Sequence, residues 1–421
     1  MLLFAQPGTM VQWLLSLRVF LGIGLISYSI YLWHQPVFAF ARARSLVEPS
    51  LTEFAWLCVL VLVLSVASYV FVETPFRKGY VLSGGKRLLA TSGGALCLVA
   101  ALGLAGHLSG GFPARAGEDV QTYMAQSGEQ LATDCYFLHG GPLPTHPIPE
   151  CLSGEGVDVV VLGDSHAQAQ SEILADQLRQ RGLSFYMISH AGCIPLPNFL
   201  RVDMGGTRRC DRFVSEVLDF AREADVDVLV LSARFQMYLQ GEGFDNGMGG
   251  VDHGPVFFVD VEDFANSSSQ SRARKDRVLA AMEDEILHLA DEFDVVLAYP
   301  IPETGWDVPQ LLARAAFFDE DVRNVATSFH SYRARAGEIV DLFDSLAQEN
   351  PNVFPARTYQ AFCDEERDIC VNTQSGRSLY YDDNHVSDSG AELTAPIIID
   401  AIEAALQRPR PMRGAGEVSG Q

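Results

Sequence analysis

The first 110 residues contain three apolar segments, which constrain the fold more than any other feature of the sequence. The segments cover residues 21–40, 54–72 and 88–108, and the second contains no charged side chain. A helix needs about 20 consecutive apolar residues to span the hydrocarbon core of a bilayer. A signal peptide would account for one such segment but not for three. We therefore predict a membrane part over residues 1–109 with three transmembrane helices.

Basic residues flank these segments unevenly. Five lie at the N-terminal side and in the loop between the second and third segments, and two lie on the opposite side: Arg18, Arg77, Lys78, Lys86 and Arg87 against Arg42 and Arg44. Because cytoplasmic loops collect Lys and Arg, the N-terminus is expected in the cytoplasm. Three crossings of a bacterial inner membrane then place the chain after about residue 110 in the periplasm or at the outer face.

Charge is also divided between the two parts of the chain. The formal net charge is −23, of which residues 1–110 hold about +4 and the remainder about −27. Contacts to phosphate need clustered Lys and Arg, so no nucleic-acid partner is expected. Residues 110–150, with Gly and Pro gathered at both ends, are predicted to be a linker. Residues 151–408 are predicted to form a second domain, and 409–421 a disordered tail.

Beyond the linker, residues 157–162 form a β-branched apolar run that is typical of a strand buried on both faces of a sheet. Gly163 and Asp164 end this run, and the sequence from residue 167 has the pattern of a helix. Ser165 is thus predicted on a tight turn between strand and helix, at the sheet edge where α/β proteins bind ligands. Backbone N–H groups at the helix start could stabilise an oxyanion there. In a competing interpretation, Asp164 or Ser165 merely caps the helix.

A second polar cluster lies just before the last predicted helix. Asp382 and His385 are three residues apart, so one short loop can present both a carboxylate and an imidazole. A serine nucleophile needs such a base, and the base needs a group that orients it. Gly-Asp-Ser followed by Asp-x-x-His resembles the SGNH/GDSL family of serine esterases and acyltransferases, over residues 135–408. The resemblance implies that Ser165 is the nucleophile, His385 the general base and Asp382 its orienting group, with Asp383 as the alternative.

Two further motifs of that family build its oxyanion hole. Gly192, which follows the second predicted strand, fits the motif that supplies a backbone N–H. At the end of the next strand the family has an Asn, but here residues 232–235 are Ser-Ala-Arg-Phe. The resemblance therefore leaves either Arg234 or backbone donors alone to complete the hole. Loss of a side-chain donor of this kind costs about 3–4 kcal/mol in well-studied hydrolases.

Strands and helices alternate through the rest of the chain. Strands are predicted at 183–188, 226–231 and 295–299, and helices at 210–223, 272–293, 323–349 and 391–406. Repeated βα units form a parallel sheet with right-handed crossovers. The predicted fold class is therefore transmembrane α-helices followed by a three-layer α/β domain, which by resemblance is SGNH-type and flavodoxin-like. Residues 241–263 are predicted to be a loop over the site. Their Asp245, Asp252 and Asp260 raise the alternative of calcium, but the spacing fits no calcium loop.

Six of the eight cysteines lie in the part predicted to be exported: Cys135, Cys151, Cys193, Cys210, Cys363 and Cys370. An even number in an oxidising compartment indicates disulfides. Pairing of neighbours would fasten three loops, although six cysteines allow fifteen connectivities. A metal site is the rival interpretation, but no Cys-x-x-Cys or His cluster has ligand spacing, so no metal is expected.

The membrane part contains a signature of its own. Residues 27–36, Ser-Tyr-Ser-Ile-Tyr-Leu-Trp-His-Gln-Pro, end the first apolar segment, and residues 73–77, Glu-Thr-Pro-Phe-Arg, follow the second. On physical grounds alone the aromatic cluster suits a membrane interface. Together the two motifs resemble the last core spans of the acyltransferase-3 family of membrane O-acyltransferases, some of which continue into a periplasmic SGNH domain. That resemblance implies transfer of acyl groups, usually acetyl, to surface glycans such as lipopolysaccharide O-antigen, peptidoglycan or exopolysaccharide.

That family has more spans than are found here, and its proposed catalytic His and Arg lie in the first few, which have no counterpart. His34 belongs to a late motif and does not replace them. We interpret the sequence as a truncated product, a fragment or one half of a split system, with a separate membrane acyltransferase subunit as a candidate partner. The glycan acceptor and membrane lipid are the other expected partners. No bound cofactor is expected, and the acyl donor, acetyl-CoA, is expected to be supplied from the cytoplasmic side.

Three functions compete at this point. In transfer, Ser165 holds the acyl group and passes it to a sugar hydroxyl; in hydrolysis, water takes it and the protein is an acetylesterase that deacetylates a surface glycan. Both need the same residues, because only the acceptor differs. A non-catalytic glycan-binding module is the third. The membrane part favours transfer, and the complete Ser/Asp/His set disfavours the module.

Overall fold

The computed structural model divides the chain into two compact units. The residues it describes are 9–45, 49–81, 84–127, 134–138, 146–203, 206–252, 254, 256–261, 268–320 and 326–409. The first unit contains Met1–Gln121 with Phe317–Asp319, and the second contains Thr122–Ala316 and Glu320–Gln421. The predicted disordered tail lies outside the described residues except for Pro409.

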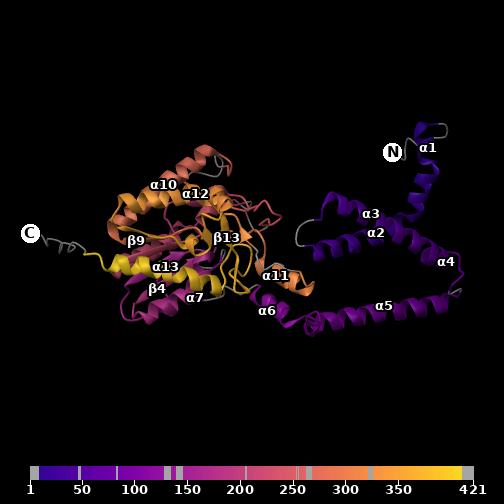
Figure 1. Ribbon diagram of the computed structural model, residues 1–421, viewed down its shortest axis with the longest axis horizontal. Coiled ribbons are helices and arrows are strands. Elements are labelled where there is room, and N and C mark those ends of the chain that lie inside the picture. The colour runs from indigo at the N-terminus through magenta and orange to yellow at the C-terminus, as the bar shows by residue number, and fades with distance from the viewer. Residues whose placement is uncertain are drawn as a thin grey trace, which may run out of the picture. The chain divides into compact units, whose positions relative to one another are not determined.

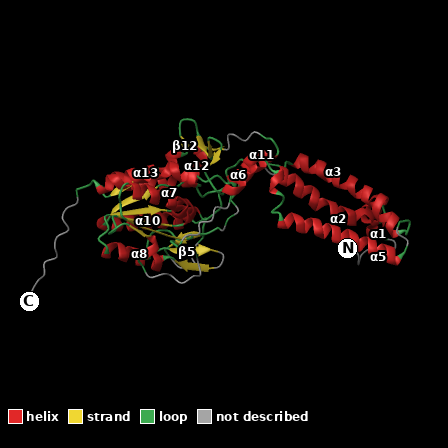
Figure 2. Ribbon diagram, turned by 90° about the horizontal axis from the view of Figure 1, so that it is seen from below, coloured by secondary structure: helices red, strands yellow, loops and turns green. Residues whose placement is uncertain are grey.

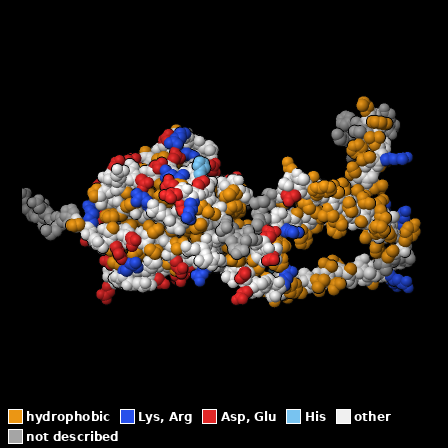
Figure 3. All heavy atoms as spheres, in the orientation of Figure 1, with side chains coloured by type: hydrophobic (Ala, Val, Ile, Leu, Met, Phe, Trp, Pro, Cys, Tyr) orange, Lys and Arg blue, Asp and Glu red, His pale blue; other side chains and the backbone are white. Residues whose placement is uncertain are grey.

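The first unit is helical. Its elements are α1 (Met10–Leu15), α2 (Arg18–Arg44), α3 (Leu51–Ser68), a π-helix (Tyr69–Glu73), α4 (Thr74–Arg77), α5 (Gly85–Leu108), a 3₁₀ turn (Pro113–Arg115) and the start of α6 (Glu118–Gln126). α3 begins at a capping box in which Ser50 and Glu53 each accept the other's backbone N–H. The indole of Trp33 on α2 donates to Ser68 Oγ on α3 at 2.7 Å. Hydrophobic side chains cover the long helices, whereas charged side chains gather on the second unit (Figure 3).

Within the part of the chain that the structure describes, two stretches, Leu51–Arg77 and Gly85–Leu108, are long and apolar enough to cross a membrane. They contain the second and third predicted segments. The first predicted segment, 21–40, lies within α2, which is longer but less apolar than α3, since Ser27, His34 and Gln35 interrupt it. The structure thus supports two candidate spans, and the three-span topology stays a prediction.

The second unit is built on a seven-stranded sheet whose long strands are all parallel. The long strands, in spatial order, are β4 (Phe185–His190), β3 (Val159–Gly163), β7 (Val228–Ser232), β9 (Asp294–Ala298) and β11 (Val353–Ala356). Beside β4, β1 (Tyr136–Phe137) pairs in parallel and β2 (Leu152–Ser153) pairs antiparallel. By position in the chain the long strands have the order 2-1-3-4-5, which is the flavodoxin-like order. The predicted parallel α/β sheet is confirmed.

Helices cover both faces of this sheet. α7 (Ser165–Gln180) and α13 (Asp388–Leu406) pack on one face, and α8 (Asp211–Glu223), α10 (Arg272–Glu292) and α12 (Phe329–Glu349) pack on the other. Figure 1 shows α10 and α12 apart from α7 and α13. Alternate residues of β3 lie on the two faces: Val161 belongs to the core cluster that contains Leu174 of α7, whereas Leu162 belongs to the cluster that contains Val217 of α8. Because both faces are buried, the strands read as continuous apolar runs, which made them predictable.

Small sheets and short helices near the carboxyl edge differ from the predictions. β5 (Leu200–Asp203) pairs antiparallel with β6 (Gly206–Arg209) and with β8 (Phe258–Asp260) in a separate sheet (Figure 2). β8 lies inside the segment predicted to be a loop. α9 (Phe235–Gln240) and α11 (Val308–Phe317) were not predicted, and α12 begins at Phe329 rather than at 323. The remaining strands form two further small sheets: β10 (Ala326–Thr327), β12 (Cys363–Asp364) and β13 (Ile369–Val371), and β14 (Thr373–Gln374) with β15 (Arg377–Ser378).

Three disulfides join neighbouring cysteines of the second unit: Cys135–Cys151, Cys193–Cys210 and Cys363–Cys370. The predicted disulfides are therefore confirmed, with the neighbour pairing among the fifteen possible connectivities. The first fastens Cys135, which precedes β1 in the segment predicted to be a linker, to Cys151 in the turn before β2. Cys58 and Cys97, in α3 and α5, are free.

Candidate active site

The predicted site residues lie together at the carboxyl edge of the sheet, although they are far apart in sequence. Ser165 is the first residue of α7 and is separated from the end of β3 by Asp164 alone; Gly192 lies on the turn after β4, and Arg234 follows β7. Asp382 and His385 lie on the loop before α13. All five line one cavity of about 360 Å³, whose other lining residues are Asp164, Ala191, Arg201, Asp252, Gly254, Phe257, Asp383 and Asn384. Parallel strands end at the same edge of a sheet, which is why the turns that follow them meet here.

Ser165, His385 and Asp382 form a continuous chain of hydrogen bonds. His385 Nε2 lies 2.8 Å from Ser165 Oγ, and His385 Nδ1 lies 2.7 Å from Asp382 Oδ2. The other oxygen of Asp382 accepts the backbone N–H groups of Asn384 and His385 at 2.9 and 2.7 Å, which fixes the carboxylate. The imidazole is stacked on Tyr381, with the ring planes inclined by 5°. A nucleophile, a base and an orienting group need this arrangement, although the catalytic roles themselves stay predictions.

The two neighbouring aspartates differ in their contacts and in their pKa. Burial would raise the pKa of Asp382, but the positive charge of His385 and the hydrogen bonds that Asp382 accepts hold that pKa below its usual value. Asp383 instead accepts from Asn384 Nδ2 at 2.5 Å and shares a hydrogen bond with Asp252. Burial and the charges of Asp252 and Asp382 raise the pKa of Asp383 to about 7. At neutral pH Asp382 is therefore an anion, as an orienting group must be, whereas Asp383 is partly protonated.

Asp164 caps the helix at the strand–helix turn, and it also helps to shape the candidate site. It is the N-cap of α7 and accepts the backbone N–H of His166 at 2.8 Å. Its second oxygen accepts the backbone N–H of Arg234 at 3.0 Å and the hydroxyl of Tyr238 at 2.7 Å. Burial raises the pKa of Asp164, while these three donors oppose the rise. Asp164 thus ties the end of β3 to the segment after β7, and Ser165 is left to face His385 rather than to cap the helix.

A second histidine lies beside the triad. His166 is buried, its Nε2 lies 3.0 Å from Asn384 Oδ1, and its ring centroid lies 4.7 Å from that of His385. Burial and the positive charges of His385 and Arg234 lower the pKa of His166 well below its usual value. His166 is therefore neutral at pH 7, and its hydrogen bond to Asn384 supports the loop that bears Asp382 and His385.

Arg234 lines the cavity, but acidic side chains hold its guanidinium. Its Nε donates to Glu303 Oε1 and its Nη2 to Asp252 Oδ2, both at 2.6 Å, and Nη2 also contacts Glu303. Arg335 donates to the other oxygen of Glu303 at 2.6 Å. All four side chains are buried. Arg234 is thus a member of a buried charge network, and its expected share in the oxyanion hole stays a prediction.

Among the residues that the structure describes, no group of three or more His, Cys, Asp or Glu is placed to hold a metal ion. The three aspartates considered for calcium have other contacts. Asp252 binds Arg234, Asp260 binds Arg277, and Asp245 accepts the backbone N–H of Gly247.

Several residues of the site were not predicted from sequence. They are Arg201, Tyr238, Glu303 and Tyr136, whose side chain is hydrogen-bonded to Ser165. Each reaches the edge of the sheet from an element far from the Ser and His motifs. One sequence signal could have indicated the buried charge network of Arg234 and Glu303. A charged residue that follows a buried apolar strand, as Glu303 follows β9, is expected to need a partner of opposite charge.

Residues 134–400 match the family described as "SGNH domain (fused to AT3 domains)". A stretch of 75 residues is 35% identical to the O-acetyltransferase OatA of Staphylococcus aureus (strain NCTC 8325 / PS 47), covering 17% of this chain and 12% of that relative. The periplasmic domain of a lipopolysaccharide acetyltransferase of Salmonella ser. Paratyphi A is similar at 14% identity and a TM-score of 0.36, covering 70% of this chain and 99% of that chain. The C-terminal catalytic domain of peptidoglycan O-acetyltransferase A of Streptococcus pneumoniae is similar at 12% identity and a TM-score of 0.30, covering 61% and 98%.

Proposed function

The chain belongs to the family of SGNH domains that are fused to AT3 domains. From this premise we propose that it transfers an acyl group, namely acetyl, to a bacterial cell-surface polysaccharide. The observation that supports this most strongly is the chain of hydrogen bonds from Asp382 through His385 to Ser165, at 2.7 and 2.8 Å. It meets the distance that a base needs to take a proton from a serine hydroxyl.

In the first half of the proposed reaction, Ser165 Oγ attacks the acyl carbonyl carbon and its proton passes to His385 Nε2. Asp382 stabilises the imidazolium that forms and keeps Nδ1 protonated. The carbonyl oxygen becomes an oxyanion and accepts from the backbone N–H groups of Ser165 and Gly192, with Arg234 as a further predicted donor. When the tetrahedral intermediate breaks down, the leaving group takes the proton from His385, and the acyl group stays on Ser165.

In the second half, a sugar hydroxyl gives its proton to His385 and attacks the acyl-enzyme. The bond to Ser165 Oγ breaks, and the serine recovers its proton from the imidazolium. The acyl group has then moved to the glycan as an ester. If water takes the place of the sugar, the same residues hydrolyse the ester, which is the acetylesterase alternative.

The cavity can hold a short acyl group. Its volume is about 360 Å³, and Phe257 is the large apolar side chain on its described wall. Pockets for small ligands have volumes of about 300–1,000 Å³, so an acetyl group and the sugar hydroxyl that accepts it fit within this cavity.

The membrane part suits this function. We propose that the candidate spans tether the chain to the inner membrane as a multi-pass protein, with the second unit in the periplasm, where the three disulfides can form. The acyl donor, acetyl-CoA, would be supplied from the cytoplasmic side, with a separate membrane acyltransferase subunit as the candidate carrier. The acceptor is the surface glycan, and membrane lipid surrounds the helices.

The test uses membranes that contain the full chain, p-nitrophenyl acetate as donor and an oligosaccharide of N-acetylglucosamine as acceptor. We expect acetate on the oligosaccharide, and its loss in Ser165→Ala. Ser171→Ala is the matched control, because Ser171 lies on the same helix and its hydroxyl donates to the backbone of Gln168. Acetate appearing only in water would favour the esterase, and undiminished release by Ser165→Ala would refute the proposed nucleophile.

A further inference from the structure

Arg201 lies on β5, outside every motif of the predicted site, yet its side chain reaches the cavity that Ser165 lines. It is buried, with 8% of its surface exposed. Burial of a guanidinium is costly unless its N–H groups find acceptors. The acceptors here are the backbone carbonyls of the turn that bears Gly192.

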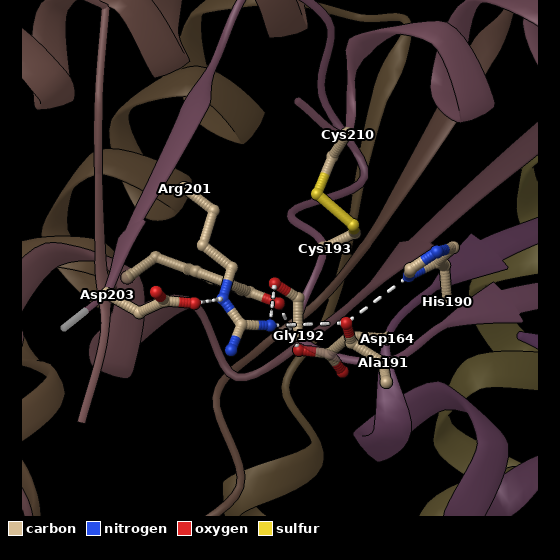
Figure 4. Close-up of a disulfide and its surroundings, with 9 residues drawn as sticks. Asp164, His190, Ala191, Gly192, Cys193, Arg201, Asp203 and Cys210 are labelled. Atoms are coloured by element: carbon tan, nitrogen blue, oxygen red, sulfur yellow. Dashed lines mark hydrogen bonds and ion pairs between the residues drawn. A yellow bond between two sulfur atoms is a disulfide. The ribbon is translucent and has the colours of Figure 1, made fainter. Parts of the chain in front are cut away.

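Figure 4 shows the guanidinium of Arg201 directed at this turn. Its Nη1 donates to Gly192 O at 3.2 Å and to Ala191 O at 3.4 Å. The contact is close enough to restrict the sequence: a Cβ at Gly192 would lie 2.2 Å from Nη1, and Gly192 has a φ of +56°, in the region that favours glycine. The turn and the guanidinium therefore fit together only with glycine at this position.

The carbonyl of Ala191 and the N–H of Gly192 belong to one planar trans peptide, so they point in opposite directions. A donor that fixes the carbonyl therefore also fixes the direction of the N–H. The adjoining N–H groups have partners, since Ala191 N donates to Phe137 O at 2.8 Å and Cys193 N to His190 O at 3.1 Å. A hydrogen bond to the carbonyl also polarises the peptide and makes its N–H a stronger donor.

Other groups hold Arg201 in this position. Its guanidinium lies over the ring of Phe257, 3.9 Å from the centroid, and Asp203 lies 3.7 Å away as an ion pair. The Cys193–Cys210 disulfide begins at the residue after Gly192 and fastens the far end of the turn (Figure 4). The charge also reaches the site, because it opposes the rise in the pKa of Tyr238 that burial and Asp164 cause. Arg201 is therefore a fixed positive group beside the turn.

We propose that Arg201 is a positioning residue of the oxyanion hole, which holds the Ala191–Gly192 peptide so that the Gly192 N–H faces the oxyanion. This inference rests on the proposed function of the same site. From the sequence, Arg234 was the side chain expected to complete the oxyanion hole, but its Nε and Nη2 are bound to Glu303 and Asp252. The inference gives a supporting role in the hole to Arg201 instead. Arg201 acts through the backbone, so its contribution does not require contact with the substrate.

The test compares an acetate ester with its thionoester, because sulfur is a poor hydrogen-bond acceptor and the oxygen-to-sulfur rate ratio reports on the oxyanion donors. Full chain in membranes is assayed with p-nitrophenyl acetate and p-nitrophenyl thionoacetate. We expect Arg201→Met to lower kcat for the ester about 10²-fold, as expected for the loss of one donor, with KM nearly unchanged and a smaller oxygen-to-sulfur ratio. Arg201→Lys can still donate to one carbonyl, so its kcat and its oxygen-to-sulfur ratio should lie between those of Arg201→Met and the unchanged chain.

Arg277→Met is the control, because Arg277 binds Asp260 of β8 in the same small sheet and does not line the cavity. Its ratio should equal that of the unchanged chain. An unchanged ratio in Arg201→Met, or an equal fall in Arg277→Met, would overturn the inference. If Arg201→Met does not fold, the Arg201→Lys variant provides the test. A lower kcat of Arg201→Lys with an unchanged oxygen-to-sulfur ratio would also overturn the inference. Activity in a parallel Ser165→Ala variant would instead refute the proposed function.

Discussion

Replacing Asp382 by Asn tests the electrostatic part of the site with little change in shape. An Asn can still accept the backbone N–H groups of Asn384 and His385, so the loop should keep its conformation. The Asn NH₂ group would, however, lie 2.7 Å from His385 Nδ1, where the carboxylate accepts at present. Two donors cannot face each other, so the imidazole would carry its proton on Nε2 and could no longer accept from Ser165.

The size of the effect follows from this geometry. In a serine protease the equivalent change lowers kcat about 10⁴-fold, because the imidazole is left in the wrong tautomer. The side chain of Asp382 is 31% exposed, so water can relieve part of the mismatch. We therefore expect a loss of about 10³-fold in kcat, which corresponds to about 4 kcal/mol of transition-state stabilisation.

The assay is kcat for p-nitrophenyl acetate with the full chain in membranes, together with the unfolding temperature of each variant. Asp383→Asn is the matched control, since this carboxyl contacts Asp252 and Asn384 rather than His385. Because the pKa of Asp383 is about 7, this carboxyl is already partly protonated at neutral pH. The uncharged amide of Asn therefore resembles the protonated form of Asp383. The reasoning would be refuted if Asp383→Asn caused the large loss and Asp382→Asn did not.

Three further predictions concern stability. Reduction of the disulfides should lower the free energy of unfolding of the second unit by about 2–4 kcal/mol for each bond, seen in denaturant titrations with and without a thiol reductant. Because the pKa of Asp383 is about 7 in the folded chain and about 4 when unfolded, the folded chain binds more protons between these values. The free energy of unfolding should thus fall as pH rises from about 4 to 7, and less steeply in Asp383→Asn. Arg274 is fully buried and donates to the carbonyls of Val259, Leu239 and Ser269, so Arg274→Met should cost about 3 kcal/mol or more in urea titrations. The exposed Arg272→Met should cost less than about 1 kcal/mol, and equal losses would contradict the argument.

The sequence predicted those parts of the fold that have a local cause. Long strands such as β3 and β7 are buried on both faces, so their apolar runs stand out. β5, β6 and β8 were missed because each has only three or four residues and is held by pairing with segments far along the chain. Propensity and periodicity contain no information about such pairing.

The candidate site shows the same division. Ser165, Asp382 and His385 could be identified because each belongs to a short motif, and the structure brings them into hydrogen-bond contact. Arg201 and Glu303 had no motif, since their significance depends on partners that the fold places beside them. Arg201 contacts residues nine and ten positions earlier, across a turn, and Glu303 contacts a residue 69 positions earlier.

The buried charge network gives a physical reason for the departure from the family's pattern after β7. A guanidinium at this buried position needs anionic partners, because an unpaired buried charge costs several kcal/mol. Arg234 finds them in Asp252 and Glu303, and these contacts use its Nε and Nη2 atoms. Asp252 then lies beside Asp383 and raises its pKa, so the charge of Arg234 is compensated within the site. With Arg234 engaged in this way, the proposed reaction relies on the backbone N–H of Gly192 as an oxyanion donor, and Arg201, which donates to the carbonyls of Ala191 and Gly192, is the side chain that we propose positions it.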